Sequence, residues 1–155
     1  MKNIKHILFV CTGNSCRSIM AEAYARKRFK EEALDIEVRS AGTLGIDGKL
    51  PTPETLKVIE DAGIDTKGYE STSLTKDLID WADLILVMEP EHKNIATAML
   101  PEANGRVRYL GEFKKPEEIR GAVILDPIGK PLAFYRVLFS VIKNHIEELI
   151  KWLKA

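Results

Sequence analysis

The sequence has few of the features that would tie it to a metal, a membrane or a nucleic acid. It contains only two cysteines, Cys11 and Cys16, which alone cannot complete a tetrahedral zinc site. It has no run of about 18 apolar residues, the length that a membrane-spanning helix needs, and the apolar run at residues 7–10 is too short for a signal peptide. Its 23 basic and 23 acidic residues cancel, which argues against a general nucleic-acid binder. We therefore expect a cytoplasmic protein that binds neither nucleic acid nor membrane, with both cysteines as thiols at rest.

The sequence also lacks internal repeats, low-complexity segments and linker-like runs. Its 155 residues suit one domain, and a chain of that size buries roughly 70% of its unfolded surface. Apolar residues make up 45% of the chain, enough for a core that needs no disulfide or metal. We expect residues 1–155 to form a single domain.

Continuous apolar runs, rather than alternating ones, predict buried parallel strands. They lie at residues 7–10, 36–39, 84–88 and 107–110. Helical spacing predicts helices at residues 18–33, 53–62, 90–99 and 132–154. The second of these helices has a proline at its first position, and Gly63 ends it. The last helix is expected to bury one broad apolar face, made of Val137, Leu138, Val141, Ile142, Ile146, Leu149, Ile150 and Leu153.

Strands that alternate with helices predict an α/β fold, a doubly wound three-layer sandwich around a four-stranded parallel sheet. In such sheets a ligand binds at the carboxyl ends of the strands. The first predicted strand ends at Val10, so Cys11 lies where a ligand is expected.

The segment between the first strand and the first helix has the composition of an anion-binding loop. Gly13 gives backbone freedom, and successive backbone N–H groups in such a loop can converge on an anion. The helix that follows adds its positive N-terminal end, and Arg17 offers a planar fork of donors to two phosphate oxygens. We therefore predict a phosphate-binding loop after the first strand, formed by Thr12, Gly13, Asn14, Ser15, Cys16 and Arg17.

At the base of this loop, Cys11 is predicted to be a nucleophile. The donors that hold a phosphate also favour a thiolate, and Ser18 can donate a further hydrogen bond to the sulfur. Two alternatives are weaker. A cysteine at a strand end is often an inert packing residue, and a nucleotide-binding loop would show the pattern G-x-x-x-x-G-K, which is absent.

The loop sequence V-C-T-G-N-S-C-R-S at residues 10–18 resembles the signature of the low-molecular-weight protein tyrosine phosphatases. The resemblance continues at residues 20–22, 40–43, 82–88 and 125–127, so it covers nearly the whole chain. It implies a metal-independent phosphomonoester hydrolase that uses no cofactor. It also implies that the substrates are phosphorylated proteins or small aryl phosphates and that the enzyme is a monomer or a weak dimer.

The same resemblance implies roles for three catalytic residues. Cys11 would take the phosphoryl group as a cysteinyl phosphate, and Arg17 would bind the phosphoryl oxygens and stabilise the transition state. Asp126, which precedes Pro127, would protonate the leaving group and then activate water to cleave the intermediate.

Four further positions support the reaction in this family. Asn14 would hold the shape of the loop, with Ser40 behind it, and Ser18 would steady the thiolate. Cys16 would form a reversible disulfide with the oxidised nucleophile, because a nearby thiol can trap a sulfenic acid. The alternative is that Cys16 is a small loop residue with no redox role.

Three departures from the family pattern bear on the site. Ser15 stands where many tyrosine phosphatases have a bulky aliphatic residue and arginine phosphatases have threonine. Ile46 and Ile128 stand where aromatic residues often flank the pocket. Each missing aromatic pair is expected to weaken stacking with a substrate ring by about 0.5–1.5 kcal/mol. Near Tyr69, another residue replaces a histidine of the family. Part of the hydrogen-bond network behind the loop must therefore differ from that of the family. Phosphotyrosine leads as the expected substrate because it is the commoner activity in the family, and phosphoarginine is the alternative.

Other activities on the same scaffold fit less well. An arsenate reductase needs two further cysteines downstream, and none follows Cys16. A non-catalytic phosphate-binding module would have no use for Asp126, and a sugar-transport subunit with a phosphocysteine would lack the pair Arg17 and Ser18. Elsewhere, His92 is expected to be a solvated surface residue, and residues 114–118 are expected to form an exposed loop.

Overall fold

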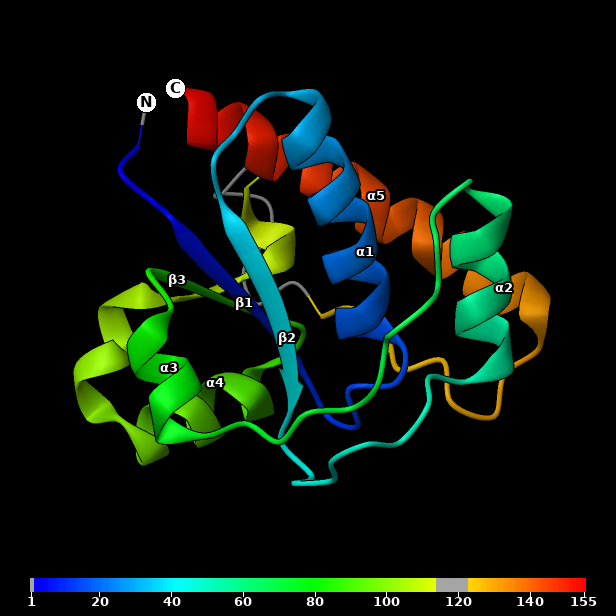
Figure 1. The fold of residues 1–155 in the computed structure, drawn as a ribbon. Helices are drawn as coiled ribbons and strands as arrows, with labels where there is room; N and C mark the ends of the chain where they lie inside the picture. The colour runs from blue at the N-terminus through cyan, green and yellow to red at the C-terminus, as the bar shows by residue number, and fades with distance from the viewer. Residues whose placement is uncertain (1, 114–122) are drawn as a thin grey trace.

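The computed structural model describes residues 2–113 and 123–155, and its centre is a four-stranded parallel sheet. The strands are β1 (His6–Cys11), β2 (Glu37–Gly42), β3 (Leu84–Val87) and β4 (Val107–Tyr109). Their spatial order is β2-β1-β3-β4 (Figure 1). All four predicted strands are confirmed. The chain passes from β1 to β2 on one side and later to β3 on the other, so the carboxyl ends of β1 and β3 flank the point where strand order reverses.

Strand β1 lies inside the molecule and contributes to two hydrophobic cores. Ile7, Phe9 and Cys11 belong to the core formed with α1 (Arg17–Glu31), α2 (Pro53–Asp61) and α5 (Leu132–Lys154). Leu8 and Val10 belong to the core formed with α3 (Lys76–Trp81) and α4 (Pro90–Met99). The sheet therefore lies between two helical layers (Figure 1), which confirms the predicted three-layer sandwich. Because both faces are covered, the strands show continuous apolar runs instead of alternation.

The structure corrects several details of the predicted elements. Strand β2 runs to Gly42 instead of ending at residue 39, because residues 40–42 continue the pairing with β1 as far as Cys11. Helix α3 was not predicted, since six residues are too few to show a helical repeat; Thr75 caps it by accepting a hydrogen bond from Leu78 N at 3.2 Å. The 3₁₀ helices η1 (Pro101–Arg106) and η2 (Leu110–Glu112) were missed for the same reason. The exposed loop predicted for residues 114–118 lies outside the described residues.

Helix α5 is amphipathic as predicted, but the prediction was wrong for two residues of its apolar face. Val137 is 66% exposed and Val141 is 39% exposed, whereas the other six predicted residues are buried. The buried stripe packs against α1 and α2, and these two valines fall outside it. Among the described residues no helix, α5 included, combines the length and the apolar character that crossing a membrane requires.

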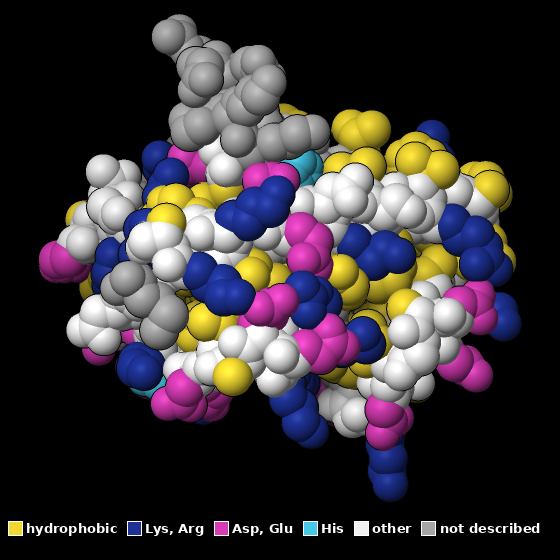
Figure 2. Space-filling view, turned by 90° about the horizontal axis from the view of Figure 1, so that it is seen from above, with side chains coloured by type: hydrophobic (Ala, Val, Ile, Leu, Met, Phe, Trp, Pro, Cys, Tyr) yellow, Lys and Arg dark blue, Asp and Glu magenta, His cyan; other side chains and the backbone are white. Residues whose placement is uncertain are grey.

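Acidic and basic side chains are interspersed over the face of the molecule that Figure 2 shows. One such group joins the first and last helices. Arg28 of α1 pairs with Glu31 of the same helix, with Glu32 just after it and with Glu147 of α5, at 2.7, 2.9 and 2.9 Å. The hydrogen bond from Arg28 is the main reason that the pKa of Glu147 lies below its usual value. The pairing ties α5 to the helix that follows the predicted phosphate-binding loop.

Candidate active site

Two positions allow the chain to turn sharply between β1 and α1. Asn14 has a φ of +52°, a left-handed conformation that asparagine tolerates better than most residues. Gly42, at the end of the neighbouring strand, lies so close to the loop that an added Cβ would be 2.8 Å from the Thr12 carbonyl oxygen and 2.9 Å from Asn14 N. Residues 12–16 therefore form a compact loop pressed against the end of β2.

Three backbone carbonyl groups of residues 11–15 are hydrogen-bonded to segments outside the loop. The Cys11, Thr12 and Ser15 carbonyls accept hydrogen bonds from the N–H groups of Thr43, Leu44 and Thr52 at 3.0, 3.0 and 3.2 Å. Within residues 2–113 and 123–155, no hydrogen bond uses the N–H groups of residues 13–16. Four backbone N–H groups are thus available to an anion at the mouth of the loop.

Hydrogen bonds around Asn14 direct a hydroxyl toward the Cys11 sulfur. The Asn14 amide donates to Ser18 Oγ at 2.7 Å and to Ser40 Oγ at 2.9 Å, and its Oδ1 accepts from Thr72 N at 2.8 Å. Ser18 Oγ lies 2.9 Å from Cys11 Sγ. Because Ser18 accepts from Asn14, the proton of the Ser18 hydroxyl can point at the Cys11 sulfur.

The network continues behind the loop to Glu22, which the sequence did not single out. Ser40 donates to Glu22 Oε1 at 2.5 Å, and Arg26 pairs with Glu22 Oε2 at 2.8 Å. Burial raises the pKa of Glu22, and the contacts with Ser40 and Arg26 oppose that shift. Arg26 also donates to Tyr69, near the position of the replaced histidine, at 3.3 Å. The Asn14 amide group thus has hydrogen-bond partners at both its nitrogen and its oxygen without that histidine.

Arg17 is buried, and its guanidinium is held on several sides at the start of α1. Nη1 donates to the Ile124 carbonyl at 2.8 Å and to Glu89 Oε2 at 3.3 Å. Nη2 donates to Thr12 Oγ1 at 3.3 Å and lies 3.8 Å from Asp126 Oδ2. Glu89 was missed in the sequence. It lies just after β3, at the carboxyl end of the sheet, where ligands bind in folds of this type.

The prediction that His92 is a solvated surface residue was wrong. Its side chain is fully buried, with Nδ1 accepting from Met88 N at 3.3 Å and Nε2 lying 2.9 Å from Thr12 Oγ1. Nε2 also lies 3.5 Å from Glu89 Oε1. Burial, together with the nearby charge of Arg17, lowers the pKa of His92 to about 4, so the ring is neutral near pH 7. The charged neighbours at residues 89 and 91 suggested a solvated helix start, but the ring turns inward instead.

The buried His92 predicts that stability falls in mild acid. Its pKa is about 4 in the folded protein and about 6.5 in the unfolded chain, so between these values the unfolded chain binds more protons. Its contribution is therefore complete above pH 6.5 and decreases by roughly 3 kcal/mol as the pH falls to 4. Urea unfolding at pH 7, 5.5 and 4.5 should show this loss in the wild type and a clearly smaller one in His92→Gln. A His6→Gln control, at the opposite end of β1, should keep the wild-type dependence, and equal dependence in all three proteins would contradict the assignment.

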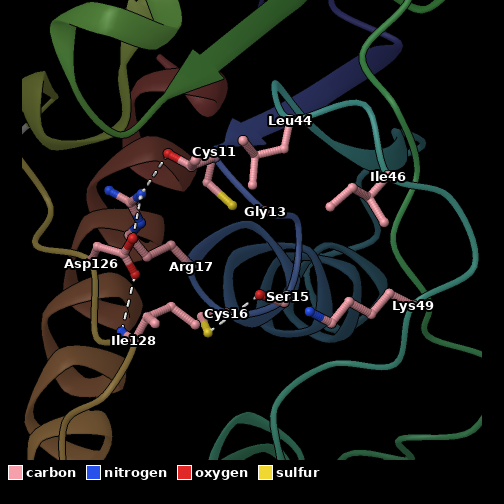
Figure 3. Close-up of a pocket in the computed structure, with 11 residues that line it drawn as sticks. Cys11, Gly13, Ser15, Cys16, Arg17, Leu44, Ile46, Lys49, Asp126 and Ile128 are labelled. Atoms are coloured by element: carbon pink, nitrogen blue, oxygen red, sulfur yellow. Dashed lines mark hydrogen bonds and ion pairs between the residues drawn. The ribbon is translucent and has the colours of Figure 1, made fainter.

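Asp126 reaches the site from the segment before α5. Its side chain is 46% exposed, and its Oδ1 accepts a hydrogen bond from Ile128 N at 3.1 Å. A turn follows, in which Lys130 N donates to the Pro127 carbonyl at 2.9 Å. The short turn fixes the carboxylate on the side of the pocket that faces Arg17 (Figure 3).

A pocket of about 290 Å³ brings most of these groups together. Its lining includes the predicted loop residues other than Asn14, together with the predicted flanking residues Ile46 and Ile128, and it adds Leu44 and Lys49, which were not predicted (Figure 3). The side chain of Asn14, which was predicted to line the phosphate site, instead points behind the loop toward Ser18 and Ser40, and none of these three lies in the pocket wall. The full lining is Cys11, Thr12, Gly13, Ser15, Cys16, Arg17, Leu44, Ile46, Lys49, Asp126 and Ile128.

The second cysteine of the loop is buried beside α2 and α5. Both cysteines are free thiols, and Cys16 Sγ lies 3.5 Å from Thr52 Oγ1 and 3.7 Å from the Tyr135 hydroxyl. Across the described part of the chain, no cluster of three or more His, Cys, Asp or Glu side chains is arranged to hold a metal ion.

Comparison with known proteins agrees with the fold and with the resemblance of the loop. The family model described as low molecular weight phosphotyrosine protein phosphatase matches residues 6–155. A protein-arginine-phosphatase of Geobacillus stearothermophilus is 33% identical over 149 residues, covering 96% of each chain.

Two solved structures illustrate the similarity in three dimensions. The YwlE arginine phosphatase, in a mutant with a phosphorylated active-site serine, matches with a TM-score of 0.90 at 32% identity, over 96% of this chain and 95% of that one. A low molecular weight protein tyrosine phosphatase from T. tengcongensis matches with a TM-score of 0.88 at 33% identity, over 96% and 99% of the two chains. The chain belongs to the low molecular weight phosphotyrosine protein phosphatase family.

Proposed function

We propose that this protein is a metal-independent phosphomonoester hydrolase that forms a cysteinyl phosphate on Cys11. The observation that carries the proposal is the pairing of Cys11 Sγ with Ser18 Oγ at 2.9 Å. It lies beneath four backbone N–H groups that no described residue uses and beside the buried Arg17. These donors favour a thiolate and equally favour the oxygens of a bound phosphoryl group. The thiolate and a dianion thus share one set of donors.

The proposed reaction has two steps. In the first, the Cys11 thiolate attacks phosphorus, the bond from phosphorus to the leaving group breaks, and Asp126 gives its proton to the leaving atom. In the second, the Asp126 carboxylate takes a proton from water, the resulting hydroxide attacks phosphorus, and the S–P bond breaks to release phosphate. Arg17 binds two phosphoryl oxygens in both steps.

A relative supports the covalent step. In the YwlE structure, the serine at the active site of the mutant carries the phosphoryl group. The direct test here is hydrolysis of p-nitrophenyl phosphate, which we expect to be unaffected by a chelator and competitively inhibited by inorganic phosphate. Loss of activity with the chelator would contradict a metal-independent reaction.

Phosphotyrosine is the first candidate substrate. The mouth of the pocket is lined by Leu44, Ile46 and Ile128, which can accept an aryl ring. Lys49 points toward Ser15 at the same mouth (Figure 3), and its ammonium group disfavours a second cation such as a guanidinium.

Phosphoarginine is the second candidate, and Ser15 is the observation that favours it. Its hydroxyl lies in the pocket wall, where it can accept a hydrogen bond from a guanidinium N–H group. The Asp126 carboxylate offers a second acceptor. Relatives from Geobacillus stearothermophilus and Bacillus subtilis, at 33% and 32% identity, are protein-arginine-phosphatases.

Ser15→Ile should separate these two substrates. Isoleucine removes the hydroxyl and fills the wall, so we expect kcat/KM on a phosphoarginyl peptide to fall about 10-fold to 100-fold, the range for a buried donor left unpaired. The value on a phosphotyrosyl peptide of the same sequence should change by less than about threefold, because an aryl ring makes no such hydrogen bond. Ser140→Ile, on the exposed face of α5, serves as the matched control. Equal effects on both peptides would rule out Ser15 as the discriminating residue.

We also propose that Cys16 protects the nucleophile from irreversible oxidation. Peroxide would convert the Cys11 thiolate to a sulfenic acid, and attack by Cys16 would form a disulfide and release water. The wild type inactivated by hydrogen peroxide should then recover with dithiothreitol, whereas Cys16→Ser should recover at least about fivefold less activity. The same recovery in both proteins would show that Cys16 has no redox role.

A further inference from the structure

Among the described residues, the hydroxyl group of Thr12 has two hydrogen-bond partners, and both are nitrogen atoms. Thr12 Oγ1 lies 2.9 Å from His92 Nε2 and 3.3 Å from Arg17 Nη2. Thr12 also lines the pocket that contains Cys11. The direction of its proton therefore decides what the pocket offers to a ligand at this position.

The backbone at the end of β3 fixes the tautomer of His92. The Met88 N–H can only donate, and it points at His92 Nδ1 at 3.3 Å, so Nδ1 accepts and carries no proton. In the neutral ring, the proton is then on Nε2, which faces Thr12. The low pKa of His92, about 4, agrees with a ring that remains neutral in this environment.

A threonine hydroxyl has one proton to donate and two lone pairs to accept hydrogen bonds. His92 Nε2–H and an Arg17 N–H group occupy the two lone pairs, so the Thr12 proton has to point elsewhere. In residues 2–113 and 123–155, no acceptor lies within hydrogen-bond distance of that proton. The remaining direction for it is the pocket.

We propose that His92 and Arg17 orient the Thr12 hydroxyl as a donor to a phosphoryl oxygen of the substrate. Thr12 is then a further substrate-binding residue, and His92 is its positioning residue. The inference rests on the proposed phosphatase function, and it adds a side-chain donor to the backbone donors of the loop. It makes Met88, the residue after β3, and His92 of α4 part of the support of the phosphoryl site.

The same principle operates on the other side of the loop. Asn14 fills an acceptor position of Ser18 and leaves its proton for the sulfur. His92 and Arg17 fill the acceptor positions of Thr12 and leave its proton for the phosphoryl group. Each hydroxyl has its direction set before substrate arrives, which is how preorganised donors stabilise developing charge.

Four variants test this arrangement: Thr12→Val, Thr12→Ser, His92→Leu and the double variant Thr12→Val/His92→Leu. Valine has the shape of threonine without the hydroxyl, so we expect kcat/KM on p-nitrophenyl phosphate to fall about 10-fold to 100-fold, as for loss of a hydrogen bond to a charged group. Thr12→Ser should recover at least about fivefold over Thr12→Val, because the hydroxyl returns. His92→Leu should lose about as much as Thr12→Val, and the double variant should lose no more than either single one.

The controls separate a positioning role from a general loss of structure. Thr97→Val removes a hydroxyl that, among the described residues, bonds only to carbonyl groups of its own helix α4. His6→Leu changes a histidine at the far end of β1. Both should retain wild-type kcat/KM. Binding of inorganic phosphate, measured by calorimetry, should weaken in Thr12→Val and His92→Leu but not in the controls.

Three results would overturn the inference. They are wild-type activity and phosphate affinity in Thr12→Val, equally low activity in Thr12→Val and Thr12→Ser, and multiplied losses in the double variant. If His92→Leu does not fold, the comparison of Thr12→Val with Thr12→Ser still tests whether the hydroxyl at position 12 contributes to activity. Failure of the wild type to hydrolyse any phosphomonoester would refute the proposed function instead, and the phosphate-binding measurement would still test the role of Thr12.

Discussion

Cys11→Ser is expected to lower hydrolysis of p-nitrophenyl phosphate by about 10⁴-fold or more, the scale seen when a catalytic nucleophile is removed. Near neutral pH, Ser18 and the N–H groups of residues 13–16, which no described residue uses, can donate hydrogen bonds to a sulfur anion. They cannot hold an alkoxide at that pH, since a serine hydroxyl is a far weaker acid. The measurement is the initial rate at saturating substrate for wild type and variant.

Retained phosphate binding is the control for this variant. The loop amides and Arg17 remain in place, so calorimetry with inorganic phosphate should still show binding, and the urea midpoint should stay close to the wild-type value. A variant that keeps these properties and has lost turnover locates the defect in bond formation. Parental turnover by Cys11→Ser would remove the basis of the proposed mechanism.

Asp126→Asn is expected to have the second largest effect, about 10²-fold to 10⁴-fold on a phosphotyrosyl peptide. Asparagine keeps the size of the side chain but cannot give up a proton to the leaving oxygen or accept one from water. The loss should be smaller on p-nitrophenyl phosphate in the first step, because p-nitrophenolate leaves without protonation. A single-turnover comparison of the two substrates separates that step from hydrolysis of the intermediate.

The matched control is Asp35→Asn, which changes a carboxylate whose side chain is 99% exposed. It should leave both rates at the wild-type level. If Asp126→Asn lowers the single-turnover rate equally for a poor and a good leaving group, Asp126 is not the acid. The proposed proton transfer would then have to be assigned to another group in the pocket.

The position and shape of the loop between β1 and α1 were predictable because the information for them is local. Cys11, Arg17 and Ser18 follow one apolar run within eight residues, and the rule for parallel sheets places the end of that run at the ligand crevice. Ile46 and Ile128 were found through the resemblance to a family and lie in the pocket wall. The fold was predictable from the continuous apolar runs. Strands have such runs when helices cover both faces of their sheet.

The residues that were missed or misjudged depend on contacts between distant segments. His92 stands in a charged stretch that is typical of a solvated helix start, and its burial follows from how α4 packs beside the loop. In the sequence, Glu89 and Glu22 do not differ from the other acidic residues. Only the folded chain places Arg17 beside Glu89 and Ser40 beside Glu22. No spacing in the sequence encodes these pairs, because their partners are 18 to 72 residues away.

The two cores that share β1 imply unequal hydrogen exchange across the site. Amide protons of β1 are paired on both edges and covered on both faces, so they are expected to exchange only through opening of the whole sheet. The backbone amides of residues 13–16 have no hydrogen-bond partner in the described chain, so they should exchange quickly, without any opening of the sheet. The Cys11 sulfur is therefore attached to a strand that is expected to open only with the whole sheet, while the N–H groups above it remain open to water until a phosphate covers them.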